Sequence, residues 1–384
     1  MIDAKFRAAS PEDVGLDPEK INELLARTAQ EVESGLLPSC QMAIAREGRI
    51  AAFATFGDAT DESLFHIFSC TKAITSAAAW LLIQDGLLDV TEPVVDVVPE
   101  FTGHGKDAIT VEQLFCHTAG FPHAPLRPVD WTDRELRLQR YRDWTLNWEP
   151  GTRYEYHPTS SMYVIAELIE RRAGASFADF VRDRVLVPLE LSDLWLGCPA
   201  EQHHRIRPVT HVGEALTSDD YAEMGLPEPP VSEVTEEALS SFNDPAIRAV
   251  PVPGGGAVTN AAELALFYQG LLHGGALGGP RVWTDETLEF ARIVRNEFPD
   301  YLGTPANRAL GVSIAGDELR NRRGFGHTNS PLAFGHGGAG GQIGWADPAT
   351  GISFSYTTNG HDRNPIRNGR RIISISNRAA VCAA

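Results

Sequence analysis

The stretch Phe68-Ser69-Cys70-Thr71-Lys72 decides how the rest of the chain is interpreted, because it lies where a strand-rich opening gives way to a helical pattern. Apolar or small residues then recur at helical spacing, at Ile74, Ala77, Ala78, Leu81 and Leu82. This spacing predicts a helix with one buried face, and Asp85-Gly86 predicts its end. Ser69 and Lys72 are therefore expected on the same face of its first turn.

This placement suits nucleophilic catalysis. A serine hydroxyl is a weak nucleophile unless a neighbouring base accepts its proton. A lysine amine is such a base when it is neutral, and both burial and the positive potential of a helix N-terminus lower a lysine pKa. The chain has 20 serines but only four lysines, and only Lys72 has a serine three residues before it. We interpret Ser69 and Lys72 as a candidate nucleophile and base; the alternative is a solvated serine beside a surface lysine.

Composition limits the class of protein. The chain has 384 residues, 43% hydrophobic and 22% charged, which is ordinary for a globular protein of one large or two close domains. Its formal net charge is −18 and no Lys/Arg-rich run occurs, so nucleic acid and anionic membranes are not expected partners. The polar N-terminus and the lack of a long apolar run predict neither a signal peptide nor a membrane span, so a cytoplasmic location is expected.

The five cysteines have long spacings and no Cys-x-x-Cys pattern, which favours free thiols over a disulfide framework. Cys70 is an alternative nucleophile, but no base stands at the right register for it. His203, His204 and His211 suggest a metal site, yet their spacing matches no known ligand pattern, so solvated loop histidines are expected. We therefore expect no metal and no cofactor.

The order of the elements predicts a mixed α/β (α+β) fold. Two hairpins are expected, at residues 42–56 around Glu47-Gly48 and at residues 343–356. Helices are expected at residues 18–34 and 367–384, near the two ends of the chain. Between them, helical stretches alternate with loops, and residues 213–250 resemble a long loop or lid. The prediction is one antiparallel sheet domain (1–90 and 250–384) flanked by helices, a mainly helical insertion domain (91–249), and a site between them.

Two further stretches supply candidate site residues. Residues 151–158 place tyrosines on a loop before a strong amphipathic helix, where a phenol of lowered pKa would share the base role; packing at the cleft rim is the alternative. The glycines of residues 335–341 lie on an expected strand, which indicates close approach of a ligand or a simple bulge.

The aromatic residues of 121–149 are either a partly solvated cover or a wall of the cleft. Gly311-Val312-Ser313-Ile314-Ala315 lacks the final glycine and the context of a nucleophile elbow.

Taken together, these stretches resemble the serine β-lactamase and penicillin-binding-protein superfamily, and specifically its class C-like family VIII carboxylesterase branch. Ser69-Cys70-Thr71-Lys72 is similar to the first motif of that family. Tyr156-His157-Pro158 stands where class C enzymes carry Tyr-x-Asn, and His336-Gly337-Gly338 stands where they carry Lys-Thr-Gly. The resemblance covers essentially the whole chain.

The resemblance implies a role for each residue. Ser69 would be the nucleophile, and Lys72 with Tyr156 would form the base. The backbone N–H groups of Ser69 and Ala339 would form the oxyanion hole, and His336, Gly337 and Gly338 would line the substrate site.

Two departures from the family pattern favour esters as substrates. Pro158 lacks the side-chain amide that would face the acylamido group of a β-lactam, and His336 weakens the positive charge that would face a carboxylate. An imidazole protonates near about pH 6 to 7, which would leave some β-lactam hydrolysis. We therefore predict a serine carboxylesterase for short-acyl esters, with a β-lactamase or D-amino acid amidase/peptidase as the alternative. A non-catalytic binder of peptidoglycan-like ligands is a third hypothesis; the natural substrate, stereopreference and oligomeric state are not predicted.

Overall fold

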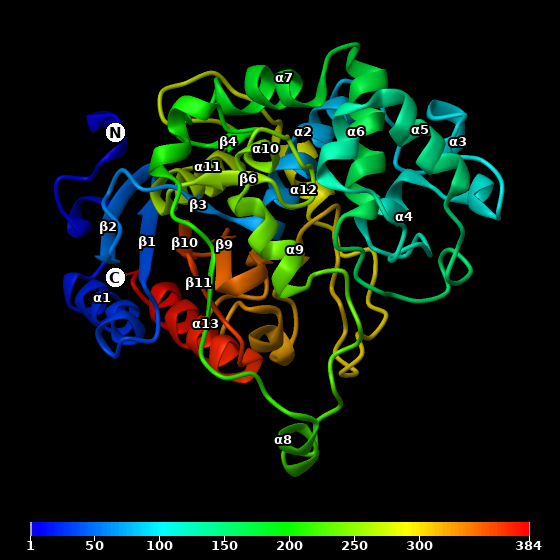
Figure 1. Ribbon diagram of the computed structural model, residues 1–384. Coiled ribbons are helices and arrows are strands. Elements are labelled where there is room, and N and C mark those ends of the chain that lie inside the picture. The colour runs from blue at the N-terminus through cyan, green and yellow to red at the C-terminus, as the bar shows by residue number, and fades with distance from the viewer. Residues whose placement is uncertain (1, 384) are drawn as a thin grey trace.

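A six-stranded antiparallel sheet built from both ends of the chain forms the centre of the computed structural model, which describes residues 2–383 (Figure 1). The strand order is β2-β1-β10-β9-β8-β7. The strands are β1 (Ser39–Arg46), β2 (Arg49–Gly57), β7 (Ser313–Ile314), β8 (Phe334–Gly338), β9 (Gln342–Asp347) and β10 (Ile352–Thr358). Both predicted hairpins are confirmed, as β1–β2 and β9–β10.

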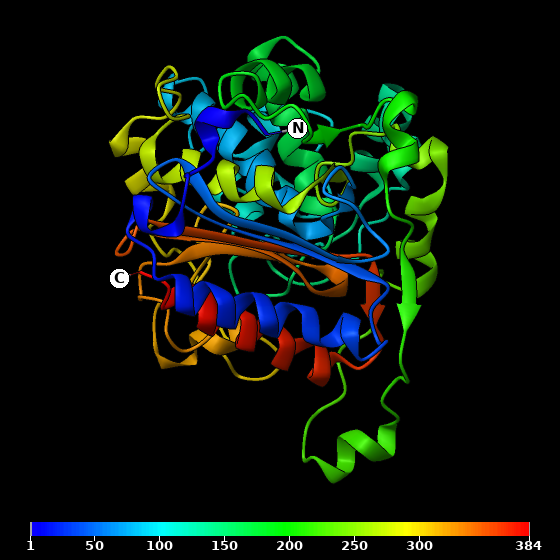
Figure 2. The same ribbon diagram turned by 90° about the vertical axis from the view of Figure 1, so that its left-hand side faces the viewer.

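Helices cover both faces of the sheet, as the edge-on view in Figure 2 shows. Helices α1 (Pro18–Glu33) and α13 (Pro365–Ala380) lie side by side on one face, and α11 (Ala261–His273) packs on the other. Alternation along β1 explains the two layers: Met42 and Ile44 join the α1–α13 core, whereas Ala43 and Ala45 join the core beneath α11. The predicted terminal helices are thereby confirmed, the second beginning at Pro365.

Helix α2 (Thr71–Gln84) starts directly after the turn that holds Ser69 and runs into the core. Every residue from Thr71 to Leu82 is buried, whereas the sequence pattern predicted only one buried face. The reason is that α2 contacts α6 (Ser160–Ala173) and α12 (Asp285–Ala291) as well as the end of the sheet. The first turn of α2 is therefore held from several sides.

The middle of the chain is mainly helical and lies beside the sheet (Figure 1). Its helices are α3 (Val94–Val97), α4 (Val111–Phe115), α5 (Arg134–Asp143), α6, α7 (Phe177–Val181), α8 (Ser218–Glu223), α9 (Glu236–Ser240) and α10 (Pro245–Arg248), with a π-helical turn at Arg182–Leu186. Short 3-10 turns lie at Ala4–Phe6, Pro11–Val14, Phe68–Cys70, Lys106–Ala108, Pro128–Thr132, Ala200–Arg205, Ser241–Asn243, Glu318–Arg323 and Ala339–Gly341. Two small sheets, β3 (Phe65–His66) with β4 (Trp195–Leu196) and β6 (Ala257–Thr259), and β5 (Thr210–Val212) with β11 (Gly360–Asp362), join this part to the main sheet.

The sequence suggested that residues 213–250 form one long loop or lid, but the structure shows three short helices within them. The first part, which carries α8, projects away from the body in both ribbon views. The second part returns and forms α9 and α10. The mixed class with an antiparallel sheet and flanking helices is confirmed, whereas the division into two domains stays a prediction. Among residues 2–383, no helix combines the length and the apolar character needed to cross a bilayer.

Candidate active site

Ser69 stands in a 3-10 turn, Phe68–Cys70, directly before α2. Phe68 has a φ of 43°, in the left-handed region that a bulky residue rarely adopts. Such a conformation persists only where the surrounding structure holds it, and it is common at functional sites. Here the Phe68 ring packs edge-on against Phe242 and His361, with ring centroids 5.3 and 5.2 Å away.

The amine of Lys72 is fully buried and lies 3.1 Å from Ser69 Oγ. It donates hydrogen bonds to the backbone carbonyls of Pro158 (2.6 Å) and Gly254 (2.8 Å). A neutral amine has two N–H donors and one lone pair. The two carbonyls take both donors, so the lone pair of the neutral form is left for the Ser69 hydroxyl. Burial is the main cause that lowers the Lys72 pKa from 10.5 to about 7, and the charge of Arg308 adds to it.

Tyr156 lies beside this pair, with its ring centroid 5.1 Å from Lys72 Nζ. Its hydroxyl is close enough to Ser69 to affect the phenol pKa, but it forms no hydrogen bond of standard geometry with a described residue. The sequence analysis expected a lowered phenol pKa, and this was wrong: burial raises the pKa of Tyr156 to about 12. A buried phenol loses the hydration of its anion, and the charge of Arg308 offsets only part of this cost.

His336 is buried on β8, and the expectation that it protonates near neutral pH was wrong. Its Nε2 accepts a hydrogen bond from the Arg308 guanidinium (3.1 Å), and its Nδ1 donates to the Gly337 carbonyl (2.6 Å). No ring nitrogen is left free to take a proton. Burial and the neighbouring charge of Arg308 together hold the His336 pKa well below its ordinary value. The positive charge next to this motif therefore belongs to Arg308.

Gly338 and Ala339 bring the end of β8 against the nucleophile turn. A Cβ on Gly338 would lie 2.3 Å from the Ile67 carbonyl oxygen, so only glycine permits this approach. Ser69 and Ala339 line the same two cavities. This juxtaposition is compatible with the predicted oxyanion hole, and the roles of Ser69, Ala339, Gly337 and Gly338 stay predictions.

Two cavities meet at Ser69. The smaller, of about 150 Å³, is mainly apolar; its walls include Phe68, Leu126, Tyr163, Leu239 and Phe242. The larger, of about 400 Å³, has a more polar wall, which includes Tyr154, Tyr156, Arg308, Arg322 and His336. Leu126 and Pro128 form part of the smaller cavity, and Trp131, Tyr141 and Trp144 are buried behind them. The segment 121–149 therefore combines aromatic anchors with a wall of the cleft.

The other candidates of the sequence analysis do not supply a nucleophile or a metal site, although Ser313 lines the larger cavity and Cys70 donates a hydrogen bond to the His336 carbonyl. Cys70 is buried, and burial raises the pKa of its thiol to about 12, which argues against a reactive thiolate. Ser313 is on the edge strand β7, paired with Gly335, and not on a strand-to-helix elbow. All five cysteines are free. Within residues 2–383, no three His, Cys, Asp or Glu side chains are grouped so as to hold a metal ion.

Sequence reasoning missed three residues of the site. Arg308 hydrogen bonds to His336 and to the Tyr154 hydroxyl (3.2 Å), and its only sequence signal was the missing cation at position 336. His117 packs on Tyr156, with ring centroids 4.6 Å apart, and accepts the His157 N–H. Glu233 accepts a hydrogen bond from Thr159 at the edge of the small cavity, where burial raises its pKa.

Known proteins of one family resemble this chain over most of its length. A family model described as Beta-lactamase matches residues 24–375. The esterase/beta-lactamase LipL of Mycobacterium tuberculosis is 27% identical over 314 residues, which are 76% of this chain and 68% of that protein. A crystal structure of a family VIII carboxylesterase superposes with a TM-score of 0.77 at 27% identity, over 95% of this chain and 99% of that one. A penicillin-binding-protein homologue from Caulobacter crescentus gives a TM-score of 0.76 at 26% identity, over 95% and 99% of the two chains.

The family model covers nearly the whole sheet and helical part, and both structural neighbours have the same β-lactamase/transpeptidase-like fold. The fold and the resemblance expected from the three motifs are confirmed. The chain therefore belongs to the beta-lactamase family and is a serine hydrolase of that family.

Proposed function

We propose that the protein is a carboxylesterase that hydrolyses short-acyl esters through a covalent acyl-enzyme on Ser69. The observation that carries the proposal is the position of the Lys72 amine. Two backbone carbonyls take its N–H donors, and its remaining hydrogen bond is with the Ser69 hydroxyl at 3.1 Å. A base of pKa about 7 is neutral in about half of the molecules at neutral pH.

Acylation begins when Ser69 Oγ attacks the ester carbonyl carbon and its proton passes to Lys72 Nζ. The negative charge that develops on the carbonyl oxygen is stabilised by the backbone N–H groups of Ser69 and Ala339. The carbon–oxygen bond to the alcohol then breaks, and the leaving oxygen takes a proton. Tyr156, whose phenol keeps its proton up to a pKa of about 12, relays that proton from Lys72.

Deacylation reverses these steps with water in place of the alcohol. Water enters on the side that the alcohol left, loses a proton through Tyr156 to Lys72, and attacks the acyl carbon. The tetrahedral species collapses, Ser69 Oγ takes the proton back, and the carboxylic acid leaves. The same base therefore serves both halves of the cycle.

The small cavity supports a short acyl group. A water molecule has a share of about 30 Å³ in the liquid, so a cavity of about 150 Å³ has room for a chain of only a few carbon atoms. Pro158 lines this cavity and offers a carbonyl to Lys72 but no side-chain amide to a substrate. Turnover should therefore be highest for acetate to butyrate esters and fall for longer chains.

The test is hydrolysis of p-nitrophenyl acetate and butyrate. Ser69→Ala should abolish turnover of both, and retained turnover would contradict the assignment. Labelling by a fluorophosphonate should occur in the natural protein and not in Ser69→Ala. Absence of labelling would favour a non-catalytic binding protein.

A β-lactamase is the second candidate, and one observation favours it. Arg308 supplies a guanidinium beside His336, on the side of the cleft where the family pattern has a cationic lysine. A carboxylate-bearing β-lactam would therefore keep a cationic partner. Nitrocefin measured beside p-nitrophenyl acetate separates the candidates, because a higher kcat/KM for nitrocefin would reverse their order.

A further inference from the structure

Tyr156 stands on an irregular stretch of chain, so no regular element fixes its position. Within residues 151–158 the backbone forms neither helix nor strand. The phenol hydroxyl itself makes no hydrogen bond with a described residue. A general acid must nevertheless lie within about 2.6–3.2 Å of the atom that receives its proton. The position of the phenol must therefore come from contacts of its ring and of its neighbours along the chain.

His117 makes three of these contacts. Its backbone carbonyl accepts the N–H of Glu155 (3.3 Å), and its ring Nδ1 accepts the N–H of His157 (3.2 Å). Its ring also packs on the Tyr156 ring, with centroids 4.6 Å apart. One residue therefore holds both chain neighbours of Tyr156 and the aromatic ring between them.

The backbone of His117 has an uncommon conformation. Its φ is 58°, in the left-handed region where Asn, Asp and His are the most frequent residues apart from glycine. Such a conformation persists only where the surrounding structure holds it, and it is common at functional sites. Here the next residue, Thr118, accepts the N–H of Gly151 (2.8 Å), so the loop of His117 is tied to both ends of the tyrosine stretch.

The hydrogen bond from His157 determines the protonation of the His117 ring. A backbone N–H can only donate, so Nδ1 carries the lone pair and the proton lies on Nε2. The ring is fully buried, and Nε2 has no hydrogen-bond partner among residues 2–383. Burial, with the charge of Arg308 as the next cause, holds the His117 pKa well below its ordinary value. The ring is therefore neutral near neutral pH, and Nδ1 remains an acceptor.

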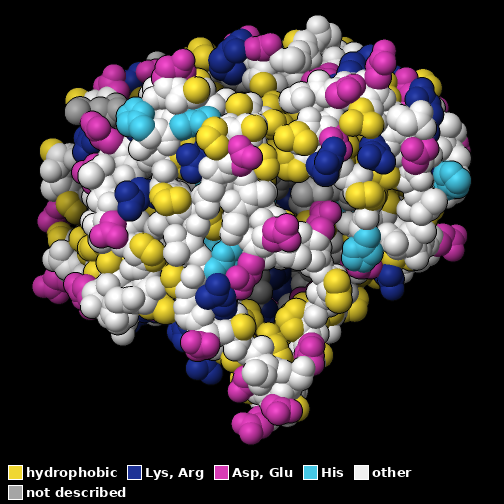
Figure 3. Space-filling model, viewed as in Figure 1, with side chains coloured by type: hydrophobic (Ala, Val, Ile, Leu, Met, Phe, Trp, Pro, Cys, Tyr) yellow, Lys and Arg dark blue, Asp and Glu magenta, His cyan; other side chains and the backbone are white. Residues whose placement is uncertain are grey.

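His117 lies behind the phenol and not in the cleft. It lines neither cavity that meets at Ser69, whereas Tyr156 lines the larger one. That cavity shares Gly337 and Gly338 with a hollow of about 730 Å³, whose outer wall is the projection that carries α8. Figure 3 shows the gap between this projection and the body. A substrate in this open cleft contacts the phenol and not the imidazole behind it, so an effect of His117 must pass through Tyr156.

We propose that His117 is a positioning residue for proton transfer: it holds the Tyr156 phenol where the leaving alcohol oxygen receives its proton. This inference rests on the proposed esterase function. As the carbon–oxygen bond breaks, the phenol gives its proton to the leaving oxygen and takes the proton that Lys72 Nζ received from Ser69. Misplacing a catalytic group by about 1 Å can cost about 10²-fold in rate. Loss of the contacts from His117 should therefore weaken this step.

Two butyrate esters test the proposal, because p-nitrophenolate leaves as a stable anion whereas ethoxide must be protonated as it leaves. His117→Phe keeps an aromatic ring but removes the Nδ1 acceptor. It should lower kcat/KM for ethyl butyrate at least about tenfold more than for p-nitrophenyl butyrate. The ratio of the two values, measured on one preparation, does not depend on the fraction of folded protein.

The possible results of this experiment are distinct. A selective loss for ethyl butyrate supports the inference. An equal loss for both esters, or no loss, would overturn it and leave the esterase assignment intact. No hydrolysis of either ester by the natural protein would contradict the proposed function, and the inference with it.

Further variants assign the effect to Tyr156. Tyr156→Phe should give the same selective loss, and adding His117→Phe to it should not change the ratio further, because no phenol is left to position. A further fall in the double variant would contradict the inference. His117→Asn offers an amide oxygen in place of Nδ1 and tolerates a left-handed φ, so it should restore part of the ratio. His104→Phe is the matched control: His104 has a similar φ of 54° but is exposed, and its loss should leave the ratio unchanged.

Discussion

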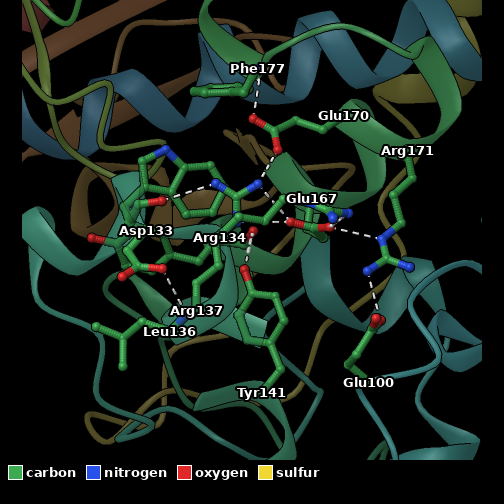
Figure 4. A network of polar contacts seen from close by, with 12 residues as sticks. Glu100, Asp133, Arg134, Leu136, Arg137, Tyr141, Glu167, Glu170, Arg171 and Phe177 are labelled. Carbon is green, nitrogen blue, oxygen red and sulfur yellow. Dashed lines mark hydrogen bonds and ion pairs between the residues drawn. The ribbon is translucent and has the colours of Figure 1, made fainter. Parts of the chain in front are cut away.

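Two groups of arginines in this molecule differ in what balances their charge. Between α5 and α6, Arg134, Arg137 and Arg171 surround Glu167, whose side chain is fully buried, and Arg137 and Arg171 also pair with Glu170 and Glu100 (Figure 4). At the cleft, Arg308 and Arg322 have no such partner among residues 2–383.

The two groups of arginines have different roles: those between α5 and α6 stabilise the fold, and those at the cleft serve the active site. Every buried charge between α5 and α6 is paired, which is what a structural network requires. At the cleft, burial is the main cause that lowers the pKa values of Lys72 and His336, and the charge that is left over on Arg308 lowers both further. Uncompensated charge next to a nucleophile is typical of sites that act on a ligand. The following predictions test this contrast, from the largest expected effect to the smallest.

Loss of the Lys72 amine should have the largest effect. Lys72→Ala should lower kcat/KM for p-nitrophenyl acetate by about 10² to 10⁴, the usual contribution of a general base. Lys72→Arg is the matched variant, because it keeps a cation that cannot deprotonate near neutral pH, and it should be similarly inactive. Activity close to natural in Lys72→Arg would mean that charge, and not proton transfer, is what the site needs.

Glu167→Gln should destabilise the ion-pair network between α5 and α6. It removes the fully buried carboxylate that Arg134, Arg137 and Arg171 share, so the free energy of unfolding should fall by about 3–5 kcal/mol, measured by urea denaturation. Glu135→Gln, an exposed change of the same chemistry on α5, is the control and should have little effect. Equal stability of the two variants would contradict the structural role of the network.

Arg308→Met should lower activity more than stability, which is the reverse of the effect of Glu167→Gln. It removes an unpaired cation, so we expect the free energy of unfolding to change by less than in Glu167→Gln, while esterase kcat/KM falls by about tenfold, the cost of one hydrogen bond to a charged group. A large loss of stability with unchanged activity per folded molecule would place Arg308 in the same class as the α5–α6 arginines.

The pH profile should report the Lys72 amine. Its pKa is lowered, so the active neutral form is present above about pH 7 and is lost as the pH falls below it. In the free enzyme, kcat/KM should therefore decline on the acid side of about pH 7. Because the charge of Arg308 helps to lower this pKa, Arg308→Met should move the acid limb to higher pH. A limb that stays in place would exclude Arg308 as a cause of the shift.

Much of the fold could be predicted from the sequence because its signals are local. Glu47-Gly48 between two apolar runs marked the first hairpin, and Asn260 caps α11 through the Glu263 N–H as its position suggested. Ser69 and Lys72 were visible because helical spacing puts them on one turn. The second half of the 213–250 segment was harder, since α9 and α10 are too short to leave a clear period.

The electrostatics of the site could not be predicted, because they depend on contacts between distant segments. Arg308 stands in no sequence motif. Isolated β-bridges to Asn296 and Ser313 hold its backbone, and its side chain hydrogen bonds to His336. The expected lowering of the Tyr156 pKa and the expected ordinary pKa of His336 were wrong for the same reason. Burial controls both, and burial follows from packing that no short pattern encodes.

The most direct measurement is the site of acylation. The natural protein is mixed with p-nitrophenyl acetate, quenched in acid within the first turnover, and digested for mass spectrometry. We predict one acetyl group on the peptide that contains Ser69, formed more slowly as the pH is lowered below about 7 and absent in Ser69→Ala. Rapid p-nitrophenol release with no acetyl group on that peptide, or with the group on another residue, would contradict the account.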